Sequence, residues 1–139
     1  MSDADNLFGD EHIRQYRETG GEVGHLWRRG SKILLLTTEG SASGQNRTSP
    51  LIYESDGDAF VIVASRGGAP KHPAWYTNLV KHPEVEVQVK DDTFRARART
   101  ATGEERERLW RLAAKQWPDY DDYQTRTERQ IPVVVLERV

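Results

Sequence analysis

The feature that most constrains the fold is a strict alternation of valine with charged or polar residues between residues 84 and 90. In this segment, EVEVQVK, Val85, Val87 and Val89 fall on one face and the other side chains on the opposite face, because successive residues of a strand alternate in direction. Two aspartates then turn the chain into residues 93–102, which alternate in the same way. The sequence therefore predicts an antiparallel hairpin with one face in a core and one in water.

Four further segments have the pattern of strands and make the chain mainly β. They are residues 32–38, 47–55, 59–65 and 131–136. The first has an unbroken apolar centre, which predicts that both of its faces are covered. Pro50 confines the start of the second strand to an edge or a bulge, and Asp56-Gly57 predicts a tight hairpin into the third.

Helical spacing is present over residues 9–19, 73–81 and 102–117. Asp10 is a candidate N-cap of the first helix, and Thr102 opens a capping-box-like TGEE before the third. The segment from 118 to 129 is polar and leads to the last strand. Strands and helices do not alternate regularly, so we expect a mainly β (α+β) fold, a small antiparallel barrel with six strands and peripheral helices.

Composition excludes several classes of function. The 139 residues favour a single domain, and the absence of cysteine excludes disulfides, thiolate metal sites and a cysteine nucleophile. A net charge of -2 provides no overall field for nucleic acid. With no signal peptide or membrane span in the sequence, we expect a cytoplasmic protein, and contact with the inner face of the membrane as a peripheral protein stays open.

The loop after the third strand, ASRGGAPKHP, is a candidate ligand site. Ser65 ends the strand, Arg66 and Lys71 carry charge, and Gly67-Gly68 permit a close approach of the backbone. On composition alone a ligand loop and a plain turn are equally consistent with this segment. The four histidines lack the spacing of metal ligands, so no metal site is expected.

Three aromatic residues lie three positions apart near the end of the chain. Trp117, Tyr120 and Tyr123 would face the same way on a helical turn. Two interpretations stay open: the rings form the wall of a pocket for an apolar or quinone-like substrate, or they cap the barrel.

Taken in order, six segments resemble the deazaflavin (coenzyme F-420)-dependent nitroreductase family of small actinobacterial reductases. The segments are ILLLTTEG, NRTSPLIY, DGDAFVIVASRGGAPKHPAWYTNL, HPEVEVQVKDDTFRARAR, GEERERLW and YDDYQTRTERQIPVVVLE. The resemblance covers residues 30–138 and is most specific over 56–79. It implies a split β-barrel that binds deazaflavin, residues 30–139, after an N-terminal helical segment, residues 1–29.

The resemblance also implies a function. It implies an oxidoreductase that transfers a hydride from reduced coenzyme F-420, an 8-hydroxy-5-deazaflavin, to an electron-poor small molecule such as a quinone, an enone or a nitro-aromatic. Two alternatives are a split-barrel reductase that binds FMN and a non-catalytic protein that binds deazaflavin. A monomer and a weak dimer are both consistent with the sequence.

Positions that match the family's motifs identify candidate site residues. For the cofactor they are Arg47, Thr48, Pro50, Ala64, Ser65, Arg66, Gly67, Gly68 and Trp75. For the acceptor they are Tyr53, Trp117, Tyr120 and Tyr123, and the candidate catalytic residues are Ser65, Tyr120 and Tyr123.

Three positions depart from the family's pattern. Ala42 stands where a basic residue is usual, so one phosphate contact is either missing or supplied by Arg28, Arg29 or Lys32. Arg66 replaces a common lysine, which keeps the charge and changes its geometry. Trp117 replaces a tyrosine of the nitroimidazole-reducing relatives, which puts activity on those drugs in doubt.

Overall fold

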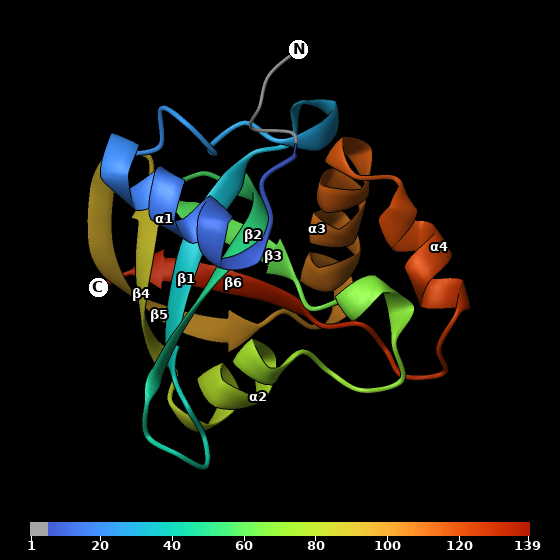
Figure 1. Ribbon diagram of the computed structural model, residues 1–139. Coiled ribbons are helices and arrows are strands. Elements are labelled where there is room, and N and C mark those ends of the chain that lie inside the picture. Colours follow the sequence, from blue (N-terminus) through green and yellow to red (C-terminus); the bar gives the residue numbers. More distant parts are fainter. Residues whose placement is uncertain (1–5) are drawn as a thin grey trace.

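Six antiparallel strands form the centre of the computed structural model, which describes residues 6–139. The strands are β1 Ile33–Glu39, β2 Asn46–Asp56, β3 Ala59–Val63, β4 Glu84–Val89, β5 Asp92–Thr100 and β6 Val133–Arg138. They close a barrel in the order β1-β2-β3-β6-β5-β4, in which every neighbouring pair is antiparallel (Figure 1). The predicted six-stranded antiparallel barrel is therefore confirmed.

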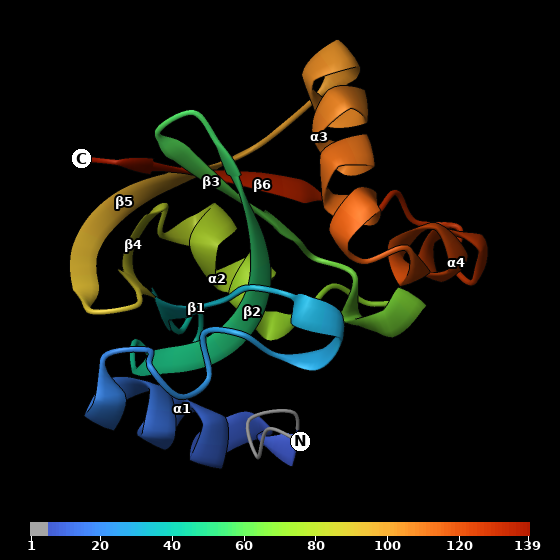
Figure 2. The same cartoon turned by 90° about the horizontal axis from the view of Figure 1, so that it is seen from above.

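Helices lie around this barrel. They are α1 Gly9–Thr19, α2 Ala74–Lys81, α3 Gly103–Gln116 and α4 Asp119–Thr125, with short 3-10 turns η2 Arg28–Gly30 and η3 Arg66–Gly68. Viewed from above, α1 lies on one side of the barrel and α3 with α4 on another (Figure 2). Side chains of α2 enter the barrel core, where Trp75 and Leu79 pack against residues of the strands.

Strand β1 has apolar side chains on both faces, as its sequence predicts. Leu34 and Leu36 lie in the barrel interior, whereas Ile33 and Leu35 pack outside it against Tyr16 of α1. The Tyr16 side chain is fully buried, and its hydroxyl donates a hydrogen bond to the Ile33 carbonyl oxygen at 2.9 Å. These contacts attach α1 to the barrel. The division into segments 1–29 and 30–139 stays a prediction, and residues 1–5 of the first segment lie outside the described part of the chain.

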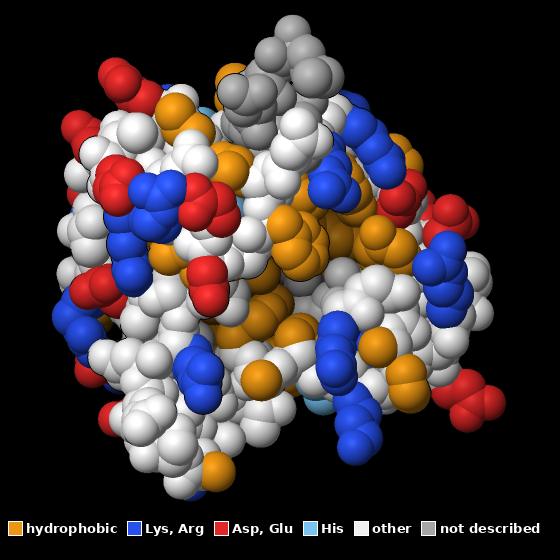
Figure 3. Space-filling view, in the orientation of Figure 1, with side chains coloured by type: hydrophobic (Ala, Val, Ile, Leu, Met, Phe, Trp, Pro, Cys, Tyr) orange, Lys and Arg blue, Asp and Glu red, His pale blue; other side chains and the backbone are white. Residues whose placement is uncertain are grey.

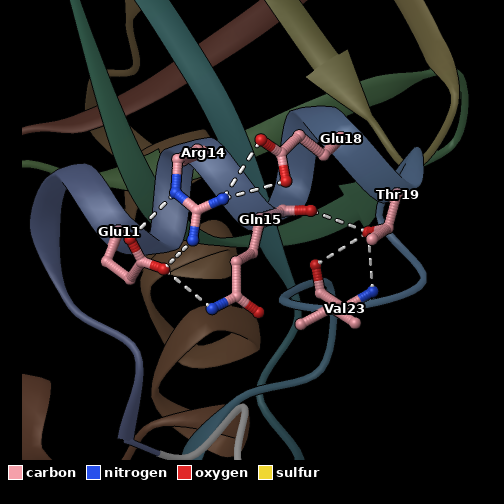
Figure 4. Close-up of polar contacts among 6 residues, drawn as sticks. All are labelled: Glu11, Arg14, Gln15, Glu18, Thr19 and Val23. Carbon is pink, nitrogen blue, oxygen red and sulfur yellow. Dashed lines mark hydrogen bonds and ion pairs between the residues drawn. The ribbon is translucent and has the colours of Figure 1, made fainter.

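The outer face of α1 is polar (Figure 4). The Arg14 guanidinium lies between the carboxylates of Glu11 and Glu18 and forms ion pairs with both. At the last residue of the helix, the Thr19 hydroxyl accepts a hydrogen bond from the Val23 N–H at 2.9 Å. The helix therefore has one solvated face and one buried face, as an amphipathic surface helix does.

Among the described residues, the half of β2 that contains Pro50 pairs with a strand on one side only. Residues 46–52 pair with β1, while pairing with β3 begins at Tyr53. The edge position predicted for Pro50 is confirmed, because its missing N–H removes no bond from a second neighbour.

Several predicted boundaries were wrong. Helix α1 begins at Gly9 after Phe8, so Asp10 lies in the first turn and is not the N-cap. Thr102 does occupy the N-cap position of α3, but its side chain makes no capping hydrogen bond. The third helix ends at Gln116, since Trp117 leaves the helical conformation before Pro118, and the polar segment after it contains α4. The third strand ends at Val63 because Ser65 turns to the helical region.

Candidate functional site

An open cavity of about 480 Å³ lies where the unpaired edge of β2 meets α1, η3 and α4. Figure 3 shows this face of the molecule hollowed near its middle, with hydrophobic side chains in the hollow and lysine and arginine side chains around it. Small-molecule sites typically have volumes of about 300–1,000 Å³ and apolar linings with a few polar groups. The cavity therefore has the size and composition of a ligand site.

Most of the predicted site residues meet in this cavity. Those in its lining are Pro50, Ser65, Arg66, Gly67, Trp75, Trp117, Tyr120 and Tyr123. They come from β2, the loop after β3, α2 and the segment around α4, so residues assigned to cofactor and to acceptor share one space.

Five predicted site residues do not line the cavity: Arg47, Thr48, Tyr53, Ala64 and Gly68. Arg47 is exposed on β2, and the Thr48 hydroxyl is hydrogen-bonded to Thr37 at 2.7 Å. Tyr53 is buried in the barrel interior, where its hydroxyl lies 2.8 Å from the His25 Nε2 atom. The geometry thus separates Tyr53 from the aromatic residues near the end of the chain.

Four lining residues of the N-terminal part were not identified from the sequence, namely Phe8, Gly9, His12 and Trp27, and Arg28 was considered only as a replacement phosphate contact. The His12 side chain is buried, and its Nε2 lies 2.8 Å from the Gly24 carbonyl oxygen. These residues lie outside the segment on which the family resemblance rests. Their approach to the cavity depends on how α1 packs against β1, for which the sequence carries no local signal.

Aromatic rings form one wall of the cavity. The indoles of Trp27 and Trp117 stack, and the rings of Tyr120 and Tyr123 meet edge to face with centroids 6.1 Å apart. The Trp117 N–H donates to the Tyr123 hydroxyl at 3.4 Å. Burial raises the pKa of the Tyr120 phenol, which therefore keeps its proton at neutral pH.

The η3 turn carries the predicted cofactor loop in an unusual backbone conformation. Arg66, Gly67 and Gly68 all have positive φ, at 47°, 63° and 82°. A Cβ on Gly67 would meet no atom of residues 6–139 within 4 Å, whereas a Cβ on Gly68 would come within 2.6 Å of the Tyr123 carbonyl oxygen. Gly67 therefore leaves room at the cavity, and Gly68 permits η3 to pack against α4.

Arg129, which the sequence analysis did not single out, holds this loop from outside the cavity. Its guanidinium donates hydrogen bonds to the carbonyl oxygens of Ala64, Ser65 and Ala69 at 3.2, 2.8 and 2.9 Å. No spacing rule connects residue 129 with residues 64–69, so only the folded chain brings them together.

The basic residues proposed to compensate for Ala42 have other contacts. Arg29 forms an ion pair with Asp119 at 2.8 Å, and Lys32 forms one with Glu54 at 2.8 Å. Arg28 lies over the Trp27 ring and lines the cavity. Lys81 contacts the loop around Ala42, where its ammonium donates to the Ser41 carbonyl oxygen at 2.7 Å.

A second hollow, of about 640 Å³, contains none of the predicted site residues. It lies over β1, β4 and β5, and charged side chains of both signs line it, among them Glu39, Lys81, Glu84 and Arg97. His82 and Glu39 lie 3.0 Å apart there. This hollow has the character of a solvated surface, so the aromatic cavity is the better candidate site.

Between residues 6 and 139, no three or more His, Cys, Asp or Glu side chains are grouped so that they could bind a metal ion. Nor does that part of the chain contain a helix of the length and apolarity needed to cross a membrane.

Comparisons with known proteins agree on one family. The family model described as F420H(2)-dependent quinone reductase matches residues 9–138. A protein of Mycobacterium tuberculosis named F420H(2)-dependent quinone reductase is 42% identical over 130 residues, which are 91% of this chain and 87% of that protein.

Two solved structures have a similar fold and sequence. One, described as an F420-H2 dependent reductase, is 45% identical with a TM-score of 0.70, and the match covers 76% of this chain and 93% of that one. Another, described as a domain-swapped dimer, is 43% identical with a TM-score of 0.74 and covers 91% of this chain and 92% of that one.

Proposed function

This chain belongs to the F420H(2)-dependent quinone reductase family, and we propose that its aromatic cavity is where a quinone accepts a hydride from reduced coenzyme F-420. The chain is an enzyme, an F-420-dependent reductase, and its cofactor is coenzyme F-420. One observation supports the aromatic cavity as the place of the reaction. The lining of a single apolar cavity joins Ser65, Arg66 and Gly67 of the predicted cofactor loop to Trp117 and the two tyrosines.

The residues of the cavity fit a flat aromatic cofactor with an anionic tail. Pro50 and Trp75 provide apolar walls, and the open space beside Gly67 leaves room for a ring system. Arg66 lies in the lining, and Arg47 is exposed on β2. We assign the ring to the apolar walls and the phosphate-bearing tail to these two guanidinium groups, which suit phosphate oxygens.

When bound, reduced coenzyme F-420 supplies the hydride, so no protein nucleophile or metal is required. The protein orients the acceptor, excludes water and provides hydrogen bonds. The neutral phenol of Tyr120 is suited to donate a hydrogen bond to an acceptor oxygen, since burial raises its pKa. The Tyr123 hydroxyl accepts from Trp117, which leaves its own proton for the acceptor. The Ser65 hydroxyl is a third candidate hydrogen-bonding group, which would position the cofactor.

A steady-state assay tests the proposed function. Purified protein with reduced coenzyme F-420 and 2-methyl-1,4-naphthoquinone is expected to oxidise the cofactor well above a control without enzyme. Arg47→Ala and Arg66→Ala are expected to weaken binding of the oxidised cofactor, measured by fluorescence titration. Absence of turnover across a panel of quinones would contradict the proposal.

We further propose that enones and nitro-aromatics also accept the hydride. Both are electron-poor and flat, and the stacked aromatic wall suits flat molecules. The same assay with an enone and a nitro-aromatic tests them. A parallel titration with FMN tests the alternative cofactor, for which we expect the weaker binding.

Assembly and membrane contact also remain proposals. A relative that is described as a domain-swapped dimer supports a weak dimer, which sedimentation at several concentrations would detect. Two large apolar side chains, Phe8 at 73% and Leu26 at 60% exposure, support peripheral contact with a membrane. Flotation with lipid vesicles tests this contact, and recovery of all the protein in the vesicle-free fraction would oppose it.

A further inference from the structure

Arg129 concentrates its hydrogen bonds on the loop that carries the predicted cofactor residues. Its Nη2 and Nη1 donate to the carbonyl oxygens of Ser65 and Ala64, and its Nε donates to that of Ala69. Nη1 also lies 3.0 Å from the His72 Nδ1. Because a guanidinium is a rigid planar fork, several carbonyl groups are held in fixed directions by one side chain.

The directions of these carbonyls determine where the neighbouring N–H groups point. In a trans peptide the C=O and the N–H of the next residue point in opposite directions. The chain contains no cis peptide among its described residues. Since the Ala64 and Ser65 carbonyls face Arg129, the N–H groups of Ser65 and Arg66 face away from it. Arg129 does not line the cavity, while Ser65 and Arg66 do.

Neither of these N–H groups has a hydrogen-bond acceptor among the described residues. The backbone of Ser65 is right-handed helical, with φ of -79° and ψ of -41°, and Arg66 follows with a φ of 47°. A right-handed residue followed by a left-handed one turns successive N–H groups toward one point and forms a concave site for anions. The side chain of Arg66 adds positive charge beside this site.

We propose that Arg129 is a positioning residue that keeps the N–H groups of Ser65 and Arg66 turned into the cavity, where they donate hydrogen bonds to a negatively polarised oxygen. Two oxygens have the required chemistry: a ring carbonyl oxygen of the deazaflavin, and the oxygen that gains charge as the acceptor is reduced. The inference rests on the proposed function.

A second contact links the same segment to the acceptor side of the cavity. Gln124 of α4 donates to the Arg129 carbonyl oxygen at 2.8 Å and accepts from the Ile131 N–H at 2.9 Å. Gly68 packs against the Tyr123 backbone. The loop is therefore held between Arg129 and α4, and a displacement of Arg129 would move residues on both sides of the cavity.

The test compares Arg129→Gln and Arg129→Lys with Arg111→Gln. Arg111 is a suitable control, since it is an exposed arginine on α3 whose ion pair with Glu107 is long, at 3.7 Å. For each protein we would measure the dissociation constant of oxidised coenzyme F-420 by fluorescence, and kcat and KM with 2-methyl-1,4-naphthoquinone. The amide signals of Ser65 and Arg66 in nuclear magnetic resonance spectra report on the N–H groups without turnover.

In the wild type, both amide signals are expected to shift on addition of oxidised coenzyme F-420 or of 2-methyl-1,4-naphthoquinone. With Arg129→Gln, we expect smaller shifts of these signals. We also expect either a higher dissociation constant of the cofactor or a lower kcat, by about 10- to 100-fold, because small displacements of positioning groups have effects of this size. If the dissociation constant of oxidised coenzyme F-420 rises, the two N–H groups bind the ring carbonyl oxygen of the cofactor. A lower kcat with unchanged cofactor binding identifies the acceptor oxygen.

The inference fails if folded Arg129→Gln matches Arg111→Gln within about twofold in every constant. If Arg129→Gln does not fold, Arg129→Lys decides, because an ammonium keeps the charge but lacks the planar fork whose three nitrogens reach the three carbonyl oxygens in fixed directions. Constants equal to the wild type in that variant would overturn the inference. A wild type that neither binds the cofactor nor turns over would instead contradict the proposed function, which separates the two failures.

Discussion

The indole rings of Trp27 and Trp117 stack with centroids 6.1 Å apart and planes inclined by 17°. This contact joins the segment before β1 to the segment between α3 and α4, and both rings line the cavity. The Arg29 guanidinium lies over the Trp117 ring at 4.1 Å and pairs with Asp119. The side of the cavity that we propose for the acceptor therefore includes a residue from the N-terminal part of the chain.

Replacing Trp27 should impair use of the acceptor more than binding of the cofactor. Trp27→Ala removes one stacked ring, and aromatic pairs contribute about 0.5–1.5 kcal/mol beyond the area they bury. We expect KM for a naphthoquinone to rise by about 3- to 10-fold, with the cofactor dissociation constant unchanged. Trp27→Phe keeps an aromatic ring, so its KM should lie between that of the wild type and that of Trp27→Ala. Weaker cofactor binding with an unchanged KM would contradict this account.

The two glycines of η3 should differ in their tolerance of a methyl group. At Gly67, alanine meets only the cost of a left-handed backbone, about 1–2 kcal/mol. At Gly68, the added Cβ would also come within 2.6 Å of the Tyr123 carbonyl oxygen, so α4 must shift. We expect Gly68→Ala to lower the free energy of unfolding by at least about 2 kcal/mol more than Gly67→Ala. Urea denaturation measures the difference, and equal losses would argue against close packing of η3 on α4.

Asn78 should be required for the loop that contains Ala42. Its side chain is 6% exposed, accepts a hydrogen bond from the Ser41 N–H at 2.9 Å and donates one to the Thr38 hydroxyl at 3.0 Å. Asn78→Ala leaves both partners unsatisfied and should cost about 1–3 kcal/mol of stability. Asn78→Asp keeps the acceptor for Ser41 and serves as the matched variant. Thermal or urea unfolding gives the values, and a neutral Asn78→Ala would refute the role.

The barrel could be predicted from the sequence because its signals are local. Val85 and Val87 alternate with charged residues, and the structure buries both of them. Pro50 marks an edge through its missing N–H, whatever the rest of the chain does. Only a helical turn was expected where α4 lies, because the segment is short and polar, and its one buried aromatic residue, Tyr120, has no apolar neighbours in sequence.

The candidate site was predicted only where the residues lie in the segments that resemble the family. Ser65, Arg66 and Trp75 follow β3 closely, and the structure places them in one cavity. Trp27 and Arg129 depend on contacts between segments far apart in the chain, which no periodicity indicates. Gly68 shows a further limit, because its sequence suggests a close approach of the backbone but not whether the neighbour is a ligand or α4.

Stability should fall as the pH drops below about 6.5, because two histidines are held neutral by the fold. Burial lowers the pKa of His25, and the positive charges of Lys90 and Lys32 lower it further. Burial also lowers the pKa of His72, and the nearby charge of Arg129 adds to this effect. A folded pKa below the unfolded value means that the unfolded chain binds more protons in this range. The contribution of these groups is therefore fully present above the unfolded pKa and is lost as the pH falls toward the folded pKa.

Urea unfolding at pH 7, 6 and 5 measures this dependence, and His25→Gln and His72→Gln should each flatten it. We expect the larger change from His25, since it is 9% exposed and its Nε2 is 2.8 Å from the Tyr53 hydroxyl, whereas the His72 side chain is exposed. Carboxylates such as Asp56, whose pKa is lowered by Arg108, act only at more acidic pH and leave this interval unchanged. A free energy of unfolding that stays constant from pH 7 to 5 would show that neither histidine is held neutral in the folded protein.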